Sequence, residues 1–175
     1  MDTTHATATG GNAEHIWERY GLGKAPFRVA GFSVEKYQAC PGAPVQPGGS
    51  CTICGQGIMN VFRVRSADGH EFKVGPDCVA KAGDAGLRKA VDKVIREHRR
   101  EVRWAREKAQ LEDGRAFLAR SDVRAALAAR PSPIAWRAEQ GDTMADWADW
   151  MMSRAGATGQ LAVISAARNL ATEAA

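Results

Sequence analysis

Four cysteines are the residues whose type and spacing point most directly to chemistry in this chain. Cys51 and Cys54 are separated by two residues and followed by Gly55, so both thiolates can reach one metal ion while the backbone turns tightly beneath it. Cys40 precedes this pair by ten intervening residues, and Cys78 follows it after twenty-three. Because four thiolates complete the tetrahedral shell of zinc, the spacing predicts one structural zinc ion.

Two other interpretations of the cysteines stay open, an iron–sulfur cluster and four buried free thiols. Free thiols belong in apolar periods, whereas three of these cysteines stand beside glycine or proline in expected loops. His70 is the substitute ligand if Cys40 cannot reach the metal, because strand alternation points its side chain inward. The chain starts with neither a basic nor an apolar signal region, so we expect a cytoplasmic protein, where cysteines bind metals more often than they form disulfides.

A β-hairpin between the third and fourth cysteines is the element most clearly encoded near the site. Alternating apolar residues must share one face across the two strands, which pairs Val64 with Phe72 and Phe62 with Val74. This pairing leaves a three-residue loop that ends at Gly69, where such loops need a residue in the left-handed region. The hairpin therefore returns the chain so that the last cysteine can approach the others.

Three neighbouring segments complete the predicted surroundings of the site. Residues 27–34 alternate in the manner of a strand, and the proline- and glycine-rich residues 41–50 predict a loop whose ends the metal would hold. Asp77 is placed to cap a short helix, which puts Cys78 in the first turn, where the helix dipole favours a thiolate.

A long basic helix is predicted to follow this module. Apolar residues recur at helical spacing from Leu87 to Ala109, and residues 84–108 hold nine Lys or Arg against five Asp or Glu, enough to account for the net charge of +4. Cations spaced along a rigid element suit phosphate contacts, although interleaved glutamates are also typical of a plain solvated face. The predicted nucleic-acid contacts are Arg63, Arg65 and Lys73 on the outer hairpin face, and Lys89, Lys93, Arg96, Arg100 and Arg103 on the helix.

Together these elements predict an α+β fold in three parts. Residues 1–12 are expected to be a disordered tail, residues 13–83 a zinc-binding β-hairpin module, and residues 84–175 a mainly helical region with one long basic helix. No apolar run approaches the ~20 residues that span a bilayer, so no membrane segment is expected. Shorter helices are predicted at residues 13–20, at 122–130 with Ser121 as cap, at 144–154 with a capping box from Thr143, and at 158–172.

The knuckle Cys51-Thr-Ile-Cys54-Gly55, the hairpin, and the stretch Val74-Gly-Pro-Asp-Cys78 resemble a treble-clef zinc finger over residues 51–82. A treble clef supplies two ligands from its helix, but Lys81 stands at the second position here, so the fourth ligand is expected upstream, from Cys40. The same stretch is similar to zinc modules in small, poorly characterised proteins of bacteriophages and mobile elements. That resemblance implies a phage or plasmid context without fixing an activity.

The sequence favours a binding protein over an enzyme. It contains no glycine-rich phosphate loop, no nucleophile elbow and no His-Glu-x-x-His pattern, and no small-molecule substrate is indicated. The first hypothesis is that the protein binds DNA, RNA or a nucleoprotein complex through its cations. The second is a protein–protein adaptor or inhibitor of a host defence complex, acting through the tryptophan- and methionine-rich residues 136–152. The spacing of these residues favours a helical core over such an interface.

Overall fold

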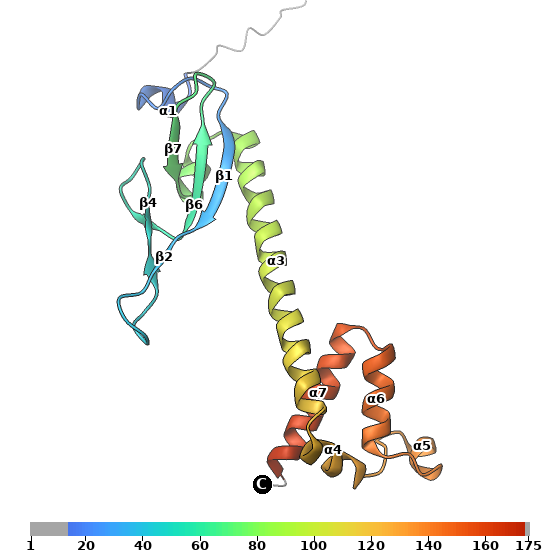
Figure 1. Cartoon of the computed structure of the whole chain (residues 1–175). Helices are drawn as coiled ribbons and strands as arrows, with labels where there is room; N and C mark the ends of the chain where they lie inside the picture. Colours follow the sequence, from blue (N-terminus) through green and yellow to red (C-terminus); the bar gives the residue numbers. More distant parts are fainter. Residues whose placement is uncertain (1–13, 174–175) are drawn as a thin grey trace, which may run out of the picture. The chain divides into compact units, whose positions relative to one another are not determined.

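An antiparallel three-stranded sheet and a 34-residue helix dominate the computed structural model, which describes residues 14–173 (Figure 1). The α+β class is confirmed, and the predicted tail at residues 1–12 lies outside the described residues. The chain divides into two compact units, residues 1–98 and 99–175. The elements are α1 Ile16–Arg19, β1 Arg28–Val34, β2 Lys36–Tyr37, β3 Gln46–Pro47, β4 Gly49–Ser50, β5 Gly57–Ile58, β6 Asn60–Arg65, β7 Glu71–Val74, α2 Pro76–Lys81, α3 Ala85–Leu118, α4 Ser121–Ala128, α5 Ala135–Glu139, α6 Met144–Arg154 and α7 Ala157–Glu173.

The hairpin of β6 and β7 has the register that the sequence predicts. Val64 pairs with Phe72 and Phe62 with Val74, and β1 lies antiparallel on the other side of β6. The loop closes where the backbone N–H of Ser66 donates to the carbonyl of His70 at 2.9 Å. Its last residue before His70 is a glycine with φ +92°, as the turn chemistry requires.

The inner face of this sheet forms the core of the first unit. Phe62, Val64 and Val74 are fully buried and belong to one apolar cluster with Leu87 and Val91 from the start of α3. Burying each such side chain stabilises the fold by roughly 1.5–3 kcal/mol. Three further aromatic rings, those of Trp17, Phe27 and Phe72, pack edge to face in the same cluster.

Local predictions around the sheet needed several corrections. The expected loop at 41–50 contains β3 and β4, which pair with β2 and β5 as two short ribbons. The first helix begins at Ile16 rather than residue 13, because His15 caps it by accepting from the N–H of Trp17. Ser121 is the first residue of α4 and not its cap, which is Arg120. Helix α5 had not been predicted.

Helix α3 changes its surroundings along its length. It starts where the Asp84 carboxylate accepts a hydrogen bond from the N–H of Leu87 at 2.9 Å, just after a glycine in the left-handed region. Its apolar residues pack on the sheet as far as His98, whose ring lies 5.1 Å from that of Phe32. Residues 99–110 are exposed on every side of the helix except at the half-buried Glu107. The apolar spacing of the helix therefore continues to Ala109, but the apolar side chains within residues 99–109 pack against no other described part of the chain.

The second unit is a small helical bundle. Its core joins Leu118 near the end of α3 to Val123, Leu127 and Val163 of the shorter helices. The predicted capping box is present, because the Thr143 side chain accepts from the N–H of Asp146. Four of the clustered residues in 136–152 pack against this core, namely Met144, Trp147, Met151 and Met152. None of the helices in the described part of the chain combines the length and the apolar character needed to cross a bilayer.

Candidate metal centre

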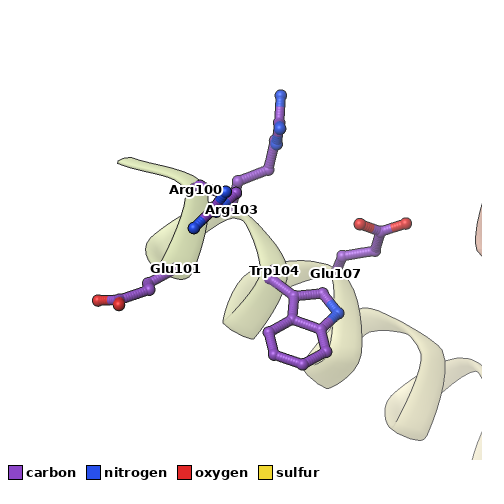
Figure 2. Close-up of a pocket in the computed structure, with 5 residues that line it drawn as sticks. All are labelled: Arg100, Glu101, Arg103, Trp104 and Glu107. Carbon is purple, nitrogen blue, oxygen red and sulfur yellow. The ribbon is translucent and has the colours of Figure 1, made fainter. Parts of the chain in front are cut away.

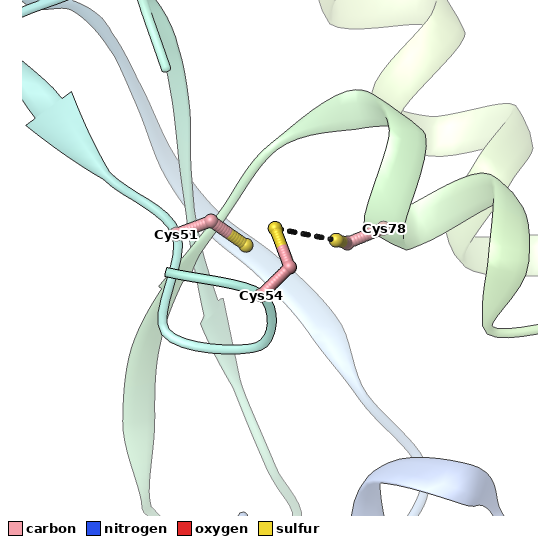
Figure 3. A group of neighbouring side chains, drawn as sticks. All are labelled: Cys51, Cys54 and Cys78. Atoms are coloured by element: carbon pink, nitrogen blue, oxygen red, sulfur yellow. Dashed lines mark hydrogen bonds between the residues drawn. The ribbon is translucent and has the colours of Figure 1, made fainter. Parts of the chain in front are cut away.

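Three of the four cysteines converge at the edge of the sheet. The ligand atoms of Cys51, Cys54 and Cys78 all lie within 4.8 Å of one another, and the thiol of Cys78 donates to the sulfur of Cys54 at 3.5 Å. Figure 3 shows the first two side chains extending from one tight loop and the third from the start of α2, with the sulfur atoms pointing toward a common centre. Cys51 and Cys78 are buried, whereas Cys54 is exposed.

Backbone hydrogen bonds explain why the loop presents two sulfurs side by side. The N–H of Gly55 donates to the carbonyl of Cys51 at 2.9 Å, and Gly55 adopts φ +71°, which makes the turn tight. The loop is fixed to the sheet because the N–H of Thr52 donates to the carbonyl of Lys73 at 2.8 Å. The knuckle is therefore part of the sheet's hydrogen-bonding pattern rather than a free appendage.

Helix α2 brings the third sulfur to the same point. Gly75 is the N-cap and Pro76 the first helical residue, so the predicted cap at Asp77 is wrong by two positions. Proline suits the first turn because its missing N–H has no acceptor there. Gly75 is buried against Ile58, where an added Cβ would lie 2.9 Å from Cγ2 of that side chain. This close approach holds the start of the helix, and with it Cys78, beside the knuckle.

The thiols of Cys51 and Cys78 differ in their affinity for protons. Burial raises the pKa of the Cys78 thiol to about 12, and the adjacent Cys54 and Cys51 thiols add to the shift. In the absence of a metal ion, burial therefore favours the protonated form of Cys78. At Cys51 burial also acts to raise the pKa, but backbone N–H groups, the first from Gly75, outweigh it and lower the pKa below its ordinary value of 9.0. Cys51 accordingly loses its proton before Cys78 does.

The donor set fits a thiophilic metal ion. Thiolates around a tetrahedral zinc ion, with Zn–S bonds of about 2.3 Å, stand about 3.8 Å apart. The sulfur separations of 3.5 Å and at most 4.8 Å are close to that spacing. A bound cation would ionise all three thiols, so uptake releases protons and strengthens as the pH rises. The geometry identifies a cluster that could hold a metal; the identity of the ion stays a prediction.

The two remaining ligand candidates lie elsewhere in the first unit. Cys40 is exposed on the connection between β2 and β3 and does not belong to the group of three. His70 is exposed in the turn before β7, so the expectation that its side chain points inward is wrong. Among the described residues no fourth His, Cys, Asp or Glu joins the three sulfurs as a close group.

The predicted hairpin cations lie on the outer face of the sheet, but acidic side chains contact two of them. Arg65 forms an ion pair with Glu71, and Lys73 contacts the Glu35 carboxylate at 3.2 Å. Arg63 lies across β1, close to Gly31. Sequence reasoning missed Arg28, which the register places directly opposite Arg65. We call Arg28, Arg63, Arg65 and Lys73 the sheet cation face.

The predicted helix cations remain together along α3 and are all exposed. With 3.6 residues per turn, Lys89, Lys93 and Arg96 lie on the side of the helix opposite the apolar residues that pack on the sheet. Among their described contacts the only ion pair is that of Lys93 with Glu97, at 4.0 Å. We call this set, Lys89, Lys93, Arg96, Arg100 and Arg103, the helix cation stripe.

An exposed tryptophan beside the helix cation stripe was also missed from sequence. Trp104 has 72% of its surface exposed, and its side chain radiates from α3 together with Arg100, Glu101, Arg103 and Glu107 (Figure 2). The signal was available, because the residue lies four positions after a stripe arginine on the same helical face. No protein-family model, curated protein sequence or solved structure matches the chain.

Proposed function

We propose that the chain is a non-enzymatic, zinc-stabilised protein that binds nucleic acid through helix α3. The metal centre supports the first part, because its donors are thiols that zinc favours and they join a loop, a sheet and a helix. The second part rests on one observation. Residues 99–110 of α3 expose arginines and a tryptophan that no other described part of the chain covers.

Electrostatics favours this stretch as a phosphate contact. Residues 99–110 contain five Lys or Arg and two Glu, which gives the stretch a net charge of +3. Arg100 and Arg103 make no ion pair in the described structure, so no neighbouring carboxylate has to be displaced before a phosphate binds. Their spacing of three residues places both on one side of a rigid helix, where they can follow a phosphate backbone.

Trp104 gives the same surface a second kind of contact. Its indole is largely exposed, so a face of the ring is free to stack on a partner. Stacking of a nucleic-acid base on an exposed aromatic ring contributes about 1–3 kcal/mol per base and does not depend on sequence. Unpaired bases are the ones free to stack, so this surface favours single-stranded over duplex nucleic acid.

The test is binding of the full chain to a labelled single strand and to its duplex across a salt series. We expect affinity to fall steeply with salt, because each neutralised phosphate releases counterions. The triple variant Arg96→Glu, Arg100→Glu, Arg103→Glu should reduce the slope of log affinity against log salt by about 3, one for each lost phosphate contact.

A matched variant separates a local contact from net charge. Lys24→Glu, Lys36→Glu and Arg154→Glu change the charge by the same amount at exposed positions away from α3. This control should retain the wild-type salt slope. Equal losses in the two triple variants would mean attraction by overall charge and would contradict a surface on α3. An absence of binding at low salt would reject nucleic acid altogether and favour the adaptor hypothesis.

The adaptor hypothesis has less structural support. Most of the tryptophan and methionine side chains on which it rests belong to the core of the second unit and are not offered to a partner. Trp136 and Trp150 lie outside that cluster, and the guanidinium of Arg137 lies 5.6 Å and 5.2 Å from their rings. Of the two, Trp136 is the more open, with 58% of its surface exposed. A phage origin and a host target stay predictions from resemblance.

A further inference from the structure

The three-cysteine centre supplies one ligand fewer than a tetrahedral zinc ion takes. Closed structural sites use four protein ligands, whereas sites with three keep a position for an exchangeable ligand. Cys40 lies on the exposed connection between β2 and β3, apart from the three sulfurs. One helical turn after Cys78 stands Lys81, whose ammonium group is a poor metal ligand while it holds its proton. The incomplete ligand set makes the space beside the sulfurs important.

That space is a cavity of about 290 Å³ in the first unit. Cys54 and Cys78 form part of its lining, so two of the three sulfur ligands border it directly. Tyr20, Ile53 and Lys81 also line it. Tyr20 is 58% exposed, so the cavity has a solvent-exposed residue in its lining. A small molecule that entered here would therefore meet the metal centre and a mixed apolar and cationic wall together.

The wall indicates which kind of molecule fits. Zinc bound by sulfur accepts soft anionic donors, and a thiolate is the soft donor closest in kind to those already present. A fourth thiolate would add negative charge, which the ammonium group of Lys81 is placed to offset. The carbon atoms of a small thiol would contact Ile53 and the ring of Tyr20. The soft sulfur, the negative charge and the small apolar part of a thiolate therefore all match this site.

We propose that the metal centre of Cys51, Cys54 and Cys78 keeps an open fourth position facing this cavity, and that a small exogenous thiol binds there as its thiolate. On binding, the thiol releases its proton to solvent and donates a sulfur lone pair to the metal, with no change of oxidation state. The inference rests on the metal proposed above but not on nucleic-acid binding. It would make metal occupancy sensitive to the concentration of cellular thiols.

Cobalt(II) in place of zinc gives a direct readout, because thiolate-to-cobalt charge transfer reports the number of bound sulfurs. The full chain would be loaded with cobalt in a thiol-free reductant and titrated with 2-mercaptoethanol. We expect a saturable rise in charge-transfer absorption of about one third, as three thiolates become four. A spectrum that does not respond to the thiol would overturn the proposal.

Three variants identify the position that responds. Lys81→Cys should close the fourth position from the next helical turn, so that absorption starts high and no longer responds to added thiol. Lys81→Met should keep cobalt uptake and weaken thiol binding several-fold, whereas Lys36→Met, a matched change on β2, should not. Equal thiol affinities in the two methionine variants would reject the role given to Lys81.

The remaining variant, Cys40→Ser, decides between an open and a closed centre. We expect the wild-type spectrum and the wild-type response to thiol. A lower starting absorption that added thiol restores would show that Cys40 is the fourth ligand, which rejects the open position but keeps the metal. A failure of the wild-type chain to bind cobalt or zinc would reject the metal centre itself. The two proposals therefore fail in distinguishable ways.

Discussion

The sheet cation face and the helix cation stripe look alike in the sequence, yet the structure surrounds them differently. On the sheet, Arg65 is paired with Glu71, which the strand register places directly opposite, and Lys73 is paired with Glu35, which follows β1. On α3, Arg100 and Arg103 project into solvent without such partners among the described residues. Positive charge alone is thus a weak indicator of a binding surface. What matters is whether the fold has already neutralised it.

The two units of the chain also depend on different forces, which metal removal should reveal. Cys54→Ser, or chelation of the wild type, removes a junction between the knuckle and α2, so we expect the first unit to lose its fold. The second unit has its own apolar core and should keep its structure. Hydrogen exchange should show lost protection in β6 and β7 and retained protection in α6 and α7.

Cys40→Ser is the control for that experiment, since this cysteine lies apart from the cluster. It should leave both metal content, about one ion per chain, and exchange protection unchanged. A metal-free protein that keeps its sheet fully protected would contradict a structural role for the metal. The sheet cation face would then owe its geometry to the apolar core alone.

A pair of aromatic substitutions gives the next largest contrast. Phe62 is fully buried under the sheet, so Phe62→Ala should lower the free energy of unfolding of the first unit by about 3–5 kcal/mol. Trp104 is 72% exposed on α3, so Trp104→Ala should change stability by no more than about 0.5 kcal/mol. Denaturant unfolding followed by circular dichroism measures both.

Trp104→Ala, which should barely change stability, should have a clear effect on nucleic-acid binding. Trp104→Ala is expected to weaken binding to a single strand about tenfold, the effect of losing one stacked base, and to leave duplex binding nearly unchanged. Trp104→Phe keeps an aromatic face and should restore much of the loss. If Trp104→Ala destabilises the protein by several kcal/mol, the ring has a structural partner, and the stacking role is wrong.

The sequence predicted best what depends on neighbours along the chain. The register of Val64 with Phe72 followed from alternation and one glycine, and the Thr143 capping box from two residues three apart. Short ribbons such as β2–β3 could not be found in this way, because their proline- and glycine-rich strands have little propensity and form through pairing. Strand propensity and turn chemistry depend on residues that are close in the sequence, whereas the pairing of these short strands depends on residues that are far apart.

The same limit explains the errors at the candidate site. Spacing identified Cys51, Cys54 and Cys78, but whether Cys40 joins them depends on the path of a connection with no periodic signal. The place of Arg28 on the sheet cation face depends on the β1–β6 register, which no turn fixes. Helical periodicity marked an apolar seam past His98 without revealing that nothing in the described chain packs on residues 99–110.

The smallest expected effect concerns the pairing of Lys73 with Glu35. The hydrogen bond from Lys73, followed by that from Ser33, lowers the pKa of the Glu35 carboxyl below its ordinary value of 4.5. A depressed pKa in the folded state stabilises the fold above the unfolded pKa, and this contribution is lost as the pH falls through the folded value. Titration by NMR should give a midpoint below 4.5 for Glu35.

Two variants test that cause and connect it to the contrast between the surfaces. Lys73→Met should raise the Glu35 midpoint toward 4.5, and Ser33→Ala should raise it by a smaller amount, in the order of their effects on the pKa. Glu35→Gln with Glu71→Gln removes both acidic partners and leaves the sheet cations free at neutral pH. If ion pairs with these carboxylates are what prevents the sheet cation face from binding phosphates, this double variant should bind single-stranded nucleic acid a few-fold more tightly than the wild type. Its affinity should also depend more steeply on salt. Unchanged affinity would mean that the helix cation stripe differs from the sheet in its geometry or its tryptophan, and not in its freedom from carboxylates.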